Sequence, residues 1–414
     1  MMRRIPAWLI SVAIVWLMAG GSTLAQSTSV PSSDTTWTDW TVQQHCADSA
    51  TLPPEGWTFD GTFFTISSEG IRAFRADFPT TYFISQGGDD FIYSAAISPD
   101  GKWLAVPHGV IETQVNTVND SHYEVQEIRL YHTTPDATLA KQIDYSALYL
   151  YVSSVFPEKV VPVFWFDNQT MIVDGGRPLA SAQVYESLGA LSINIIDGEV
   201  KHITSKTTLY HYPNLSPDLT RIISARYNSF NEVYGLYNLE TDQLQFEFPV
   251  NQWKNAGWTP DSAIVAVQTV NENYRQMGII FISRDGSPLD TVITGQDDIF
   301  ASNFEWSPDG NQFGLIIHRQ ISKGANPGLD VWSRTLYLGD MQKRTLTHTC
   351  IGDIEDYVWK FDNQQIAIAP GDENYNKFGL IFDLDQNNLY QIESFKGDLM
   401  GWYPNEKSLV PGNE

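Results

Sequence analysis

A short strand–turn–strand unit recurs along this chain and constrains its fold more than any other feature. One copy is EWSPDGNQFGLII, which begins at Glu305. Proline presets φ at the first turn position, and Asp-Gly or Asp-Asn suits a tight reversal. The apolar alternation that follows predicts a half-buried strand. The copies share an acidic or amide turn residue, at Asp100, Asp167, Asp218, Asp261, Asp309, Asp362 and Asn405.

The spacing of these copies sets the size of the repeating unit. The intervals between the shared turn residues run from 43 to 67 residues. Most lie close to the length of one four-stranded propeller blade, roughly 40–50 residues. Each copy is followed by a second alternating pair, such as the one that begins at Gly278, so the unit is predicted to be four antiparallel strands. Tryptophans before the turns are expected to pack between blades, at Trp165, Trp258, Trp306, Trp359 and Trp402.

The repeated W-S-P-D-G element, followed by strands of alternating apolar residues, resembles the WD-like repeats of TolB-type β-propellers. The resemblance covers the chain from about Gly56 to its end. The copies lack the G-H and W-D dipeptides of true WD repeats. Because this fold serves many tasks, the resemblance implies the architecture and leaves the function open.

The two ends of the chain are predicted to share one blade. The last copy, around Trp402, has too little chain after it to complete a blade, and segments 62–67, 71–76 and 80–85 supply three candidate strands. Joining both ends in one sheet removes exposed strand edges. We therefore expect an all-β, seven-bladed propeller of four-stranded antiparallel blades. Eight blades is the alternative, because the WTFDG segment at Trp57 also imitates a repeat.

The N-terminus is predicted to be a secretory signal peptide. Arg3 and Arg4 precede an apolar run at 7–19, and the small residues Thr23 and Ala25 offer a cleavage site. The run is shorter than the roughly 20 apolar residues of a spanning helix, so an uncleaved membrane anchor is the alternative. We expect a secreted or periplasmic protein without a membrane span after cleavage. The predicted domains are a signal peptide at 1–25, a linker or N-terminal extension at 26–52 and a β-propeller at 53–414.

Export changes how the two cysteines are interpreted. Cys46 and Cys350 would lie in an oxidising compartment, where a pair of cysteines can form a disulfide. Such a bridge would tie the N-terminal segment to a late part of the chain. The alternative is two unrelated buried thiols.

The charge of the chain narrows its partner classes. Among 414 residues, 25 are basic and 49 are acidic, which gives a formal net charge of −24. A surface of this sign repels phosphate backbones and anionic lipid, so we expect no nucleic-acid partner. It is compatible with cations, with basic protein surfaces, or with solubility alone.

Acidic residues recur in the segments that connect one predicted blade to the next. We expect these segments on the face opposite the repeat turns, around the mouth of the central channel. Carboxylates that converge there would bind a basic loop of a partner or a divalent cation. The alternative is that aspartate is an ordinary turn residue at these places. The candidate binding residues are Asp89, Asp90, Asp297, Asp298, Asp353, Asp356 and Asp398.

Binding is better supported than catalysis by the sequence. Longer loops are predicted on the same face, over 108–123, 175–189 and 318–332, and such loops often carry interactions. The sequence has no G-x-S-x-G elbow, no H-E-x-x-H zinc motif and no phosphate-binding or dinucleotide fingerprint. We therefore predict an exported, monomeric binding scaffold for protein or peptide partners, without catalytic residues or a cofactor. A metal-dependent lyase or lactonase in the channel and a small-ligand sensor are the alternatives.

Overall fold

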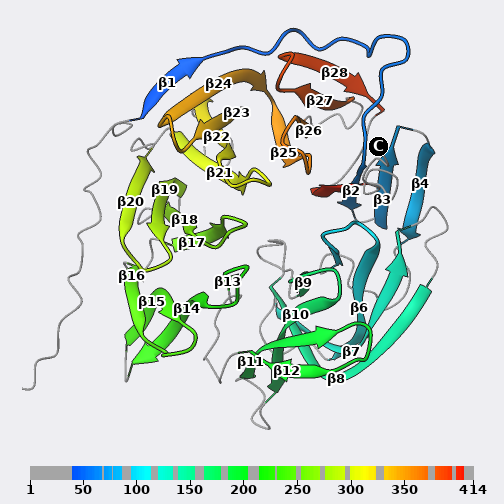
Figure 1. Ribbon diagram of the computed structural model, residues 1–414, viewed down its shortest axis with the longest axis vertical. Coiled ribbons are helices and arrows are strands. Elements are labelled where there is room, and N and C mark those ends of the chain that lie inside the picture. Colours follow the sequence, from blue (N-terminus) through cyan, green and yellow to red (C-terminus); the bar gives the residue numbers. More distant parts are fainter. Residues whose placement is uncertain are drawn as a thin grey trace, which may run out of the picture.

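The regular structure of this chain is β-strand, arranged as seven small sheets in a ring (Figure 1). This arrangement confirms the predicted seven-bladed β-propeller. In the described residues, no helix is long and apolar enough to cross a membrane. The computed structural model describes residues 40–67, 70–76, 78–85, 95–112, 120–133, 139–153, 163–178, 185–203, 214–228, 231–248, 253–270, 276–293, 299–322, 331–371, 378–393 and 398–404.

Each blade contains four antiparallel strands, and the first of them lies at the channel. We number the blades in chain order, and blade 1 is the one that contains β2. Blade 1 consists of β29 (Asp398–Tyr403), β2 (Thr62–Ser67), β3 (Gly70–Arg75) and β4 (Phe78–Ser85). Blade 2 consists of β5 (Ala96–Ile97), β6 (Trp103–Glu112), β7 (Asp120–His132) and β8 (Leu139–Ser153). Blade 3 consists of β9 (Val163–Trp165), β10 (Thr170–Pro178), β11 (Tyr185–Asn194) and β12 (Val200–His202).

The remaining four blades follow the same order from the channel outward. Blade 4 consists of β13 (Asn214–Leu215), β14 (Arg221–Asn228), β15 (Asn231–Asn238) and β16 (Leu244–Phe248), and blade 5 of β17 (Trp253–Trp258), β18 (Ile264–Val270), β19 (Gln276–Ser283) and β20 (Pro288–Ile293). Blade 6 consists of β21 (Ile299–Trp306), β22 (Gln312–Ser322), β23 (Val331–Asp340) and β24 (Thr345–Gly352). Blade 7 consists of β25 (Ile354–Trp359), β26 (Gln365–Pro370), β27 (Gly379–Asp383) and β28 (Asn388–Ile392).

Blade 1 joins the two ends of the chain, as predicted. The last strand, β29, pairs antiparallel with β2, and Trp402 lies opposite Phe63 in the register. The Phe63 ring stacks on Phe74 with centroids 4.9 Å apart and meets the Trp402 ring edge-on at 5.5 Å. Burial of these aromatic faces stabilises a joint that no peptide bond crosses.

The repeat turn is held by hydrogen bonds between its own side chains and backbone. In blade 6 the Ser307 hydroxyl donates to Asp309 Oδ1 over 2.6 Å, and the same carboxylate oxygen accepts from the Asn311 N–H over 3.1 Å. Ser307 Oγ also accepts from the N–H of Gln312. These bonds fix the reversal, which explains why a hydroxyl residue and an aspartate recur two positions apart. The same pairing joins Ser98 to Asp100, Ser216 to Asp218 and Thr259 to Asp261.

The residue after the turn aspartate contacts the preceding blade. Its φ is positive in several copies, for example 71° at Gly310 and 64° at Asn363. A Cβ at Gly310 would lie 3.1 Å from Pro260 Cδ of blade 5, so glycine permits close packing there. Asn363 instead accepts a hydrogen bond through Oδ1 from the N–H of Asp309, over 3.2 Å. The variation at this position therefore follows two ways of joining neighbouring blades.

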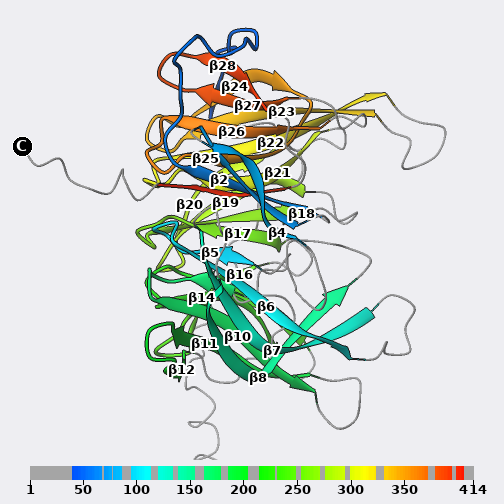
Figure 2. The ribbon, with the colours of Figure 1, turned by 90° about the vertical axis from the view of Figure 1, so that its right-hand side faces the viewer.

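The two faces of the ring differ in how their connections are built (Figure 2). The repeat turns share one face, the turn face, with the turns between third and fourth strands, because the N–H of Met341 donates to the Asn311 carbonyl. We call the opposite side the loop face. The loops predicted there are shorter than expected, since the strand alternation continues into them. Strand pairing extends to Glu112 opposite His122, to Pro178 opposite Tyr185 and to Ser322 opposite Val331.

Residues 40–61 form an N-terminal strap around the outside of the ring (dark blue in Figure 1). Trp40 is only 5% exposed, and its ring lies 6.0 Å from Phe281 of blade 5 and 5.6 Å from Phe313 of blade 6. The strand β1 (Thr41–Gln44) then pairs parallel with β24 as a fifth strand of blade 6. The strap thus begins in the boundary between two blades and continues along the edge of one.

The strap is fixed covalently and then crosses blade 7. A disulfide joins Cys46 to Cys350 on β24, so the predicted pairing is present. Beyond it, Thr51 forms a parallel bridge with Tyr390 of β28, and the Trp57 ring lies 4.6 Å from the Tyr390 ring. The chain then enters β2 of blade 1. One segment therefore links blade 6 to blade 1 across blade 7.

Candidate functional site

Three of the predicted acidic residues lie in the described part of the chain. Asp353 is exposed between β24 and β25, whereas Asp356 is 7% exposed. Asp356 Oδ2 accepts from the N–H of Leu399, which follows Asp398, and its Oδ1 accepts from Asn303 Nδ2. The Asp356 carboxylate therefore connects blades 6, 7 and 1. Asp89, Asp90, Asp297 and Asp298 lie outside the described residues, so the convergence of the acidic loops stays a prediction.

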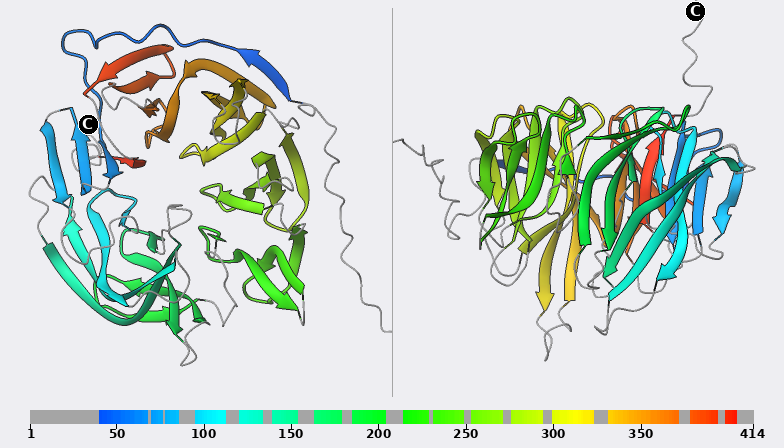
Figure 3. Two further views of the ribbon diagram at one scale, coloured as in Figure 1. Left: turned by 180° about the vertical axis from the view of Figure 1, so that it is seen from behind. Right: turned by 90° about the horizontal axis from the view of Figure 1, so that it is seen from below.

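Blade 6 carries a hairpin that projects on the loop face. The ends of β22 and β23, residues 319–322 and 331–334, project beyond the ring and are here named the blade-6 finger (yellow, Figures 2 and 3). Ile321 is 66% exposed and Val331 is 51% exposed at neighbouring positions of this paired hairpin. Large apolar side chains so close together in solvent are typical of interaction surfaces.

The finger has an exposed strand edge. The last pair between β23 and β24 joins Thr335 to Gly352, so residues 331–334 of β23 pair only with β22. On their other side, no described strand forms a β-ladder with them. Such an edge presents backbone N–H and C=O groups that lack a ladder partner.

Five side chains gather on the side of the finger that faces blade 7. Residues further along the same sides of β22 and β23, Ile316 and Leu336, pack in the core shared with blade 7. Because side chains alternate along strands, the members of the cluster share that orientation. We call this the aromatic–arginine cluster, and its members are Phe300, Ser302, His318, Trp332 and Arg334.

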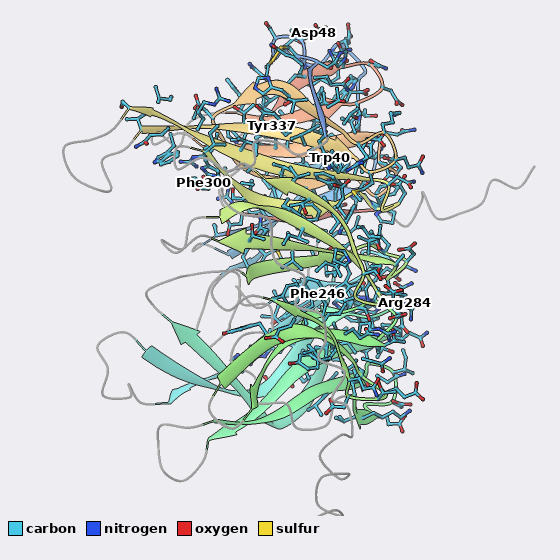
Figure 4. All side chains as sticks on the ribbon, turned by 90° about the vertical axis from the view of Figure 1, so that its left-hand side faces the viewer. Trp40, Asp48, Phe246, Arg284, Phe300 and Tyr337 are labelled. Carbon is cyan, nitrogen blue, oxygen red and sulfur yellow. A yellow bond between two sulfur atoms is a disulfide. The ribbon has the colours of Figure 1, made fainter. Side chains whose placement is uncertain are left out.

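The rings of the cluster pack on one another. Phe300 stacks on the His318 imidazole with centroids 4.1 Å apart and planes 13° apart. The Trp332 ring meets Phe300 edge-on, with centroids 5.0 Å apart. Figure 4 shows Phe300 on the loop-face side of the ring, whereas Arg284 lies on the turn face. The rings form an apolar surface beside the exposed edge of β23.

Ser302 and His318 form a close pair that superficially resembles a catalytic dyad. Ser302 Oγ lies 2.6 Å from His318 Nε2. Burial, and secondly the nearby Arg334 charge, lower the pKa of His318 to about 4. The imidazole is therefore neutral at pH 7, and a base so weak removes a serine proton poorly. This pair is suited to fixing the ring positions rather than to activating a nucleophile.

Arg334 differs from three other arginines of the structure in its lack of an ion pair with a described carboxylate. Arg129, Arg284 and Arg344 each form an ion pair, with Glu127, Asp218 and Asp290 respectively. Among the described residues, no carboxylate forms an ion pair with Arg334. Its guanidinium lies against blade 7, where a Cβ at Gly371 would be 3.0 Å from Nη1. The absence of a side chain at Gly371 therefore leaves room for the guanidinium.

The sequence did not indicate the aromatic–arginine cluster. Residues 318–332 were interpreted as a loop, and no local motif links Phe300 to Arg334. The signal that was present is strand alternation on both sides of the turn, in IIHRQIS before it and VWSRTLYL after it. Two such runs around a Gly- and Pro-containing turn predict an extended hairpin.

Comparisons with known proteins support the fold alone. No protein-family model matches the chain, and no curated protein matches it in sequence. A solved structure of oligogalacturonate lyase in complex with manganese is similar at a TM-score of 0.51 and 12% identity, over 81% of this chain and 84% of that one. The oligogalacturonate lyase of Vibrio parahaemolyticus gives 0.50 and 11%, over 84% and 87%. TolB from Acinetobacter baumannii gives 0.39 and 12%, over 83% and 82%.

Proposed function

We propose that this protein is an exported binding scaffold whose loop face holds a protein or peptide partner. The observation that carries the proposal is the blade-6 finger, which exposes Ile321 and Val331 beside a strand edge that no described strand pairs with. Partners bind such a surface because contact removes apolar area from water and supplies missing backbone hydrogen bonds. The protein is a monomer in this proposal and has no nucleic-acid partner.

The disulfide supports an extracytoplasmic location. The Cys46–Cys350 bond is exposed at the outer edge of blade 6, and exposed disulfides persist where the surroundings are oxidising. This agrees with the secretory signal peptide predicted at residues 1–25, which lies outside the described residues. We propose a secreted or periplasmic protein on this basis.

A capture experiment tests the scaffold proposal. Immobilised mature protein is incubated with secreted and periplasmic extract, and each captured protein is then purified and its Kd measured. The double variant I321S/V331S should weaken binding at least tenfold, because it removes the apolar contact area. Ile196→Ser is the matched control, since Ile196 is 65% exposed but lies in a turn of the turn face. Equal binding by all three proteins would contradict the proposal.

A metal-dependent lyase is the second candidate, favoured by the fold likeness to oligogalacturonate lyase in complex with manganese. Within the described residues, no group of three His, Cys, Asp or Glu side chains could hold a metal ion. Asp89, Asp90, Asp297 and Asp298 lie outside that search. Metal analysis of the purified protein, together with lyase assays on oligogalacturonate, separates the two candidates. Stoichiometric manganese with turnover would establish the enzyme.

A further inference from the structure

We infer that the partner contributes an extended acidic peptide, which adds as a strand to β23 at residues 331–334 and places a carboxylate against Arg334. The inference rests on the proposed function, because it specifies the chemistry of the partner on the loop face. It is carried by three separate features of the finger: a strand edge, a side-chain register and an arginine without a carboxylate partner among the described residues.

The strand edge supplies the backbone part of the interaction. Among the described strands, residues 331–334 pair with β22 alone, so one side of this segment is left without a ladder. An extended peptide satisfies the N–H and C=O groups on the other side by β-strand addition. Blade 6 already accepts an extended segment in this way, because Thr41–Gln44 of the strap pairs parallel with β24. The added peptide would continue this pattern on the neighbouring strand where β24 has ended.

The side-chain register defines the sequence of the peptide. Trp332 and Arg334 are two residues apart on β23, so they lie on the same face of the sheet. On neighbouring strands, side chains of one face approach to about 5 Å between Cβ atoms. A peptide added to this edge therefore places residues i and i+2 beside Trp332 and Arg334. The matching pair is an aromatic or apolar residue and an aspartate or glutamate.

The charge of Arg334 selects the carboxylate. The chain has a net charge of −24, yet this guanidinium forms no ion pair within the described part of the structure. The neutral His318 imidazole lies close enough for the Arg334 charge to act on it, and the Arg334 side chain is partly buried. Coulombic attraction is stronger in such a setting than in bulk solvent, and guanidinium–carboxylate hydrogen bonds are among the stronger ones in proteins.

A peptide fits these features better than an acidic saccharide does. A saccharide also offers carboxylates to Arg334 and ring faces to Trp332. It has no alternating N–H and C=O groups, however, and so leaves the edge of β23 unpaired. The strand edge is therefore the observation that favours a peptide, and an acidic oligosaccharide becomes an outcome for the experiment to test.

Fluorescence anisotropy with synthetic peptides tests the inference on the full mature protein. The probes are the labelled heptapeptide acetyl-Thr-Val-Glu-Val-Phe-Thr-Val-amide, the version with Glu and Phe exchanged, and the same peptides with Gln for Glu. We expect one Glu peptide to bind about tenfold more tightly than its Gln counterpart, because it alone forms the charge-assisted bond. Arg334→Gln should abolish this difference. Arg284→Gln removes the same charge from the turn face and should preserve it.

Two further variants separate the role of Arg334 from its effect on folding. Gly371→Ala keeps the arginine but crowds its guanidinium, whose flexible end can move, so the protein should fold and bind the Glu peptide several-fold more weakly. Glu355→Gln should strengthen binding modestly, because it removes a negative charge from a residue whose Cβ lies 3.4 Å from the same position at Gly371 and which forms no ion pair with Arg334 among the described residues. N-methylation of alternate peptide amides should abolish binding, since it blocks strand pairing.

Several results would overturn the inference. Equal affinity of wild type and Arg334→Gln for the Glu peptide excludes the carboxylate site, and full binding of the N-methylated peptide excludes strand addition. Arg334-dependent binding of an oligogalacturonide, without binding of peptides, assigns the site to an acidic saccharide. If the protein captures a partner through Ile321 and Val331 but does not bind the peptides, the proposed function is supported and this inference alone is rejected.

Discussion

The arc of blades 6, 7 and 1 and the arc of blades 2 to 4 are closed in different ways. The strap covers the outer side of blades 6 and 7, where it pairs with β24 and bridges to β28, and it then enters blade 1 as β2 (Figure 1). In the second arc the outer strands are β8, β12 and β16, and no described strand pairs with their outer edges. The first arc is therefore held by an added segment, whereas the second depends on contacts between blades.

The strap lies next to the place where the ring is closed by strand pairing and not by the backbone. The backbone runs continuously from each blade to the next, except at the β29–β2 pair inside blade 1, where the two chain ends meet. The strap continues directly from β2 to blade 6, where Cys46 is bonded to Cys350. Movement of blade 1 away from blades 6 and 7 would therefore require the strap to detach or the disulfide to break. The extra covalent closure lies where the backbone provides none.

Removal of the disulfide should have the largest effect on stability. Cys46 and Cys350 are 304 residues apart, and in the chain-entropy model a loop of this length stabilises the folded state by about 6 kcal/mol. The C46S/C350S protein should lose a large part of that free energy of unfolding, measured with guanidinium chloride. The wild type in dithiothreitol should lose as much, whereas the double variant should not respond to the reductant. A loss below 1 kcal/mol would show that the strap is not needed for closure.

Trp40→Ala should destabilise the strapped arc by about 3 kcal/mol, since it removes a buried ring packed against Phe281 and Phe313. Leu52→Ala is the control on the same strap, because Leu52 is 74% exposed and its loss should change stability little. Thermal and denaturant unfolding of the two variants measures the difference. Equal effects would mean that the disulfide alone holds the strap and that burial of the Trp40 ring contributes little.

His318→Gln should remove a pH dependence of stability that arises on the finger, outside the reach of the strap. The folded-state pKa of about 4 lies below the ordinary value of 6.5. As the pH falls from 6.5 to 4, the unfolded state therefore binds the proton first, and the wild type loses about 2 kcal/mol. Glutamine keeps a hydrogen-bonding group beside Ser302 but does not titrate. Urea unfolding at pH 7 and pH 4.5 compares the two proteins.

The same experiment in the C46S/C350S background sharpens the comparison between strap and finger. The two sites share no contact, so their effects should add. His348→Gln provides a control, because burial also lowers the pKa of His348 but this ring is less enclosed. Its removal should reduce the pH dependence by a smaller amount. A pH dependence that disappears with the disulfide would place its origin at the strap.

The architecture was predictable because its signals are local. The hydroxyl and aspartate of a turn such as Ser307–Asp309 bond within five residues, and the alternation that follows marks the next strand. Repetition then fixes the number of blades without knowledge of any contact between them. Closure through segment 62–67 followed from the same counting, because one incomplete blade remained at each end of the chain. The Cys46–Cys350 pairing required only the predicted compartment.

The strap and the aromatic–arginine cluster depend on contacts that sequence alone does not show. Residues 40–52 were part of a predicted linker or extension, and their place on blades 6 and 7 is set by partners such as Cys350 and Tyr390. The cluster likewise joins Phe300 on β21 to residues of β22 and β23. Turn signals and alternation specify each strand, but they do not state which side chains of different strands meet.

Tryptophans of the repeat offer the smallest and most local test of how adjacent blades are joined. Trp306 Nε1 donates to the carbonyl of Gly257 in blade 5 over 2.9 Å, and Trp165 Nε1 donates to Ala96 in blade 2 over 3.0 Å. The equivalent Trp258 Nε1 is buried and has no hydrogen-bond partner among the described residues. Within the described residues, the boundary between blades 5 and 6 thus has a tryptophan hydrogen bond that the boundary between blades 4 and 5 lacks.

Phenylalanine substitutions measure the contribution of that hydrogen bond to the free energy of unfolding. Trp306→Phe should cost about 1 kcal/mol more than Trp258→Phe, because it leaves the Gly257 carbonyl without its donor. Trp258→Phe removes a donor that was already unpaired, which offsets part of the lost packing. Both changes delete the same ring volume, so denaturant unfolding of the pair isolates the hydrogen bond. Equal losses of stability would mean that side-chain packing, and not the tryptophan hydrogen bond, joins these neighbouring blades.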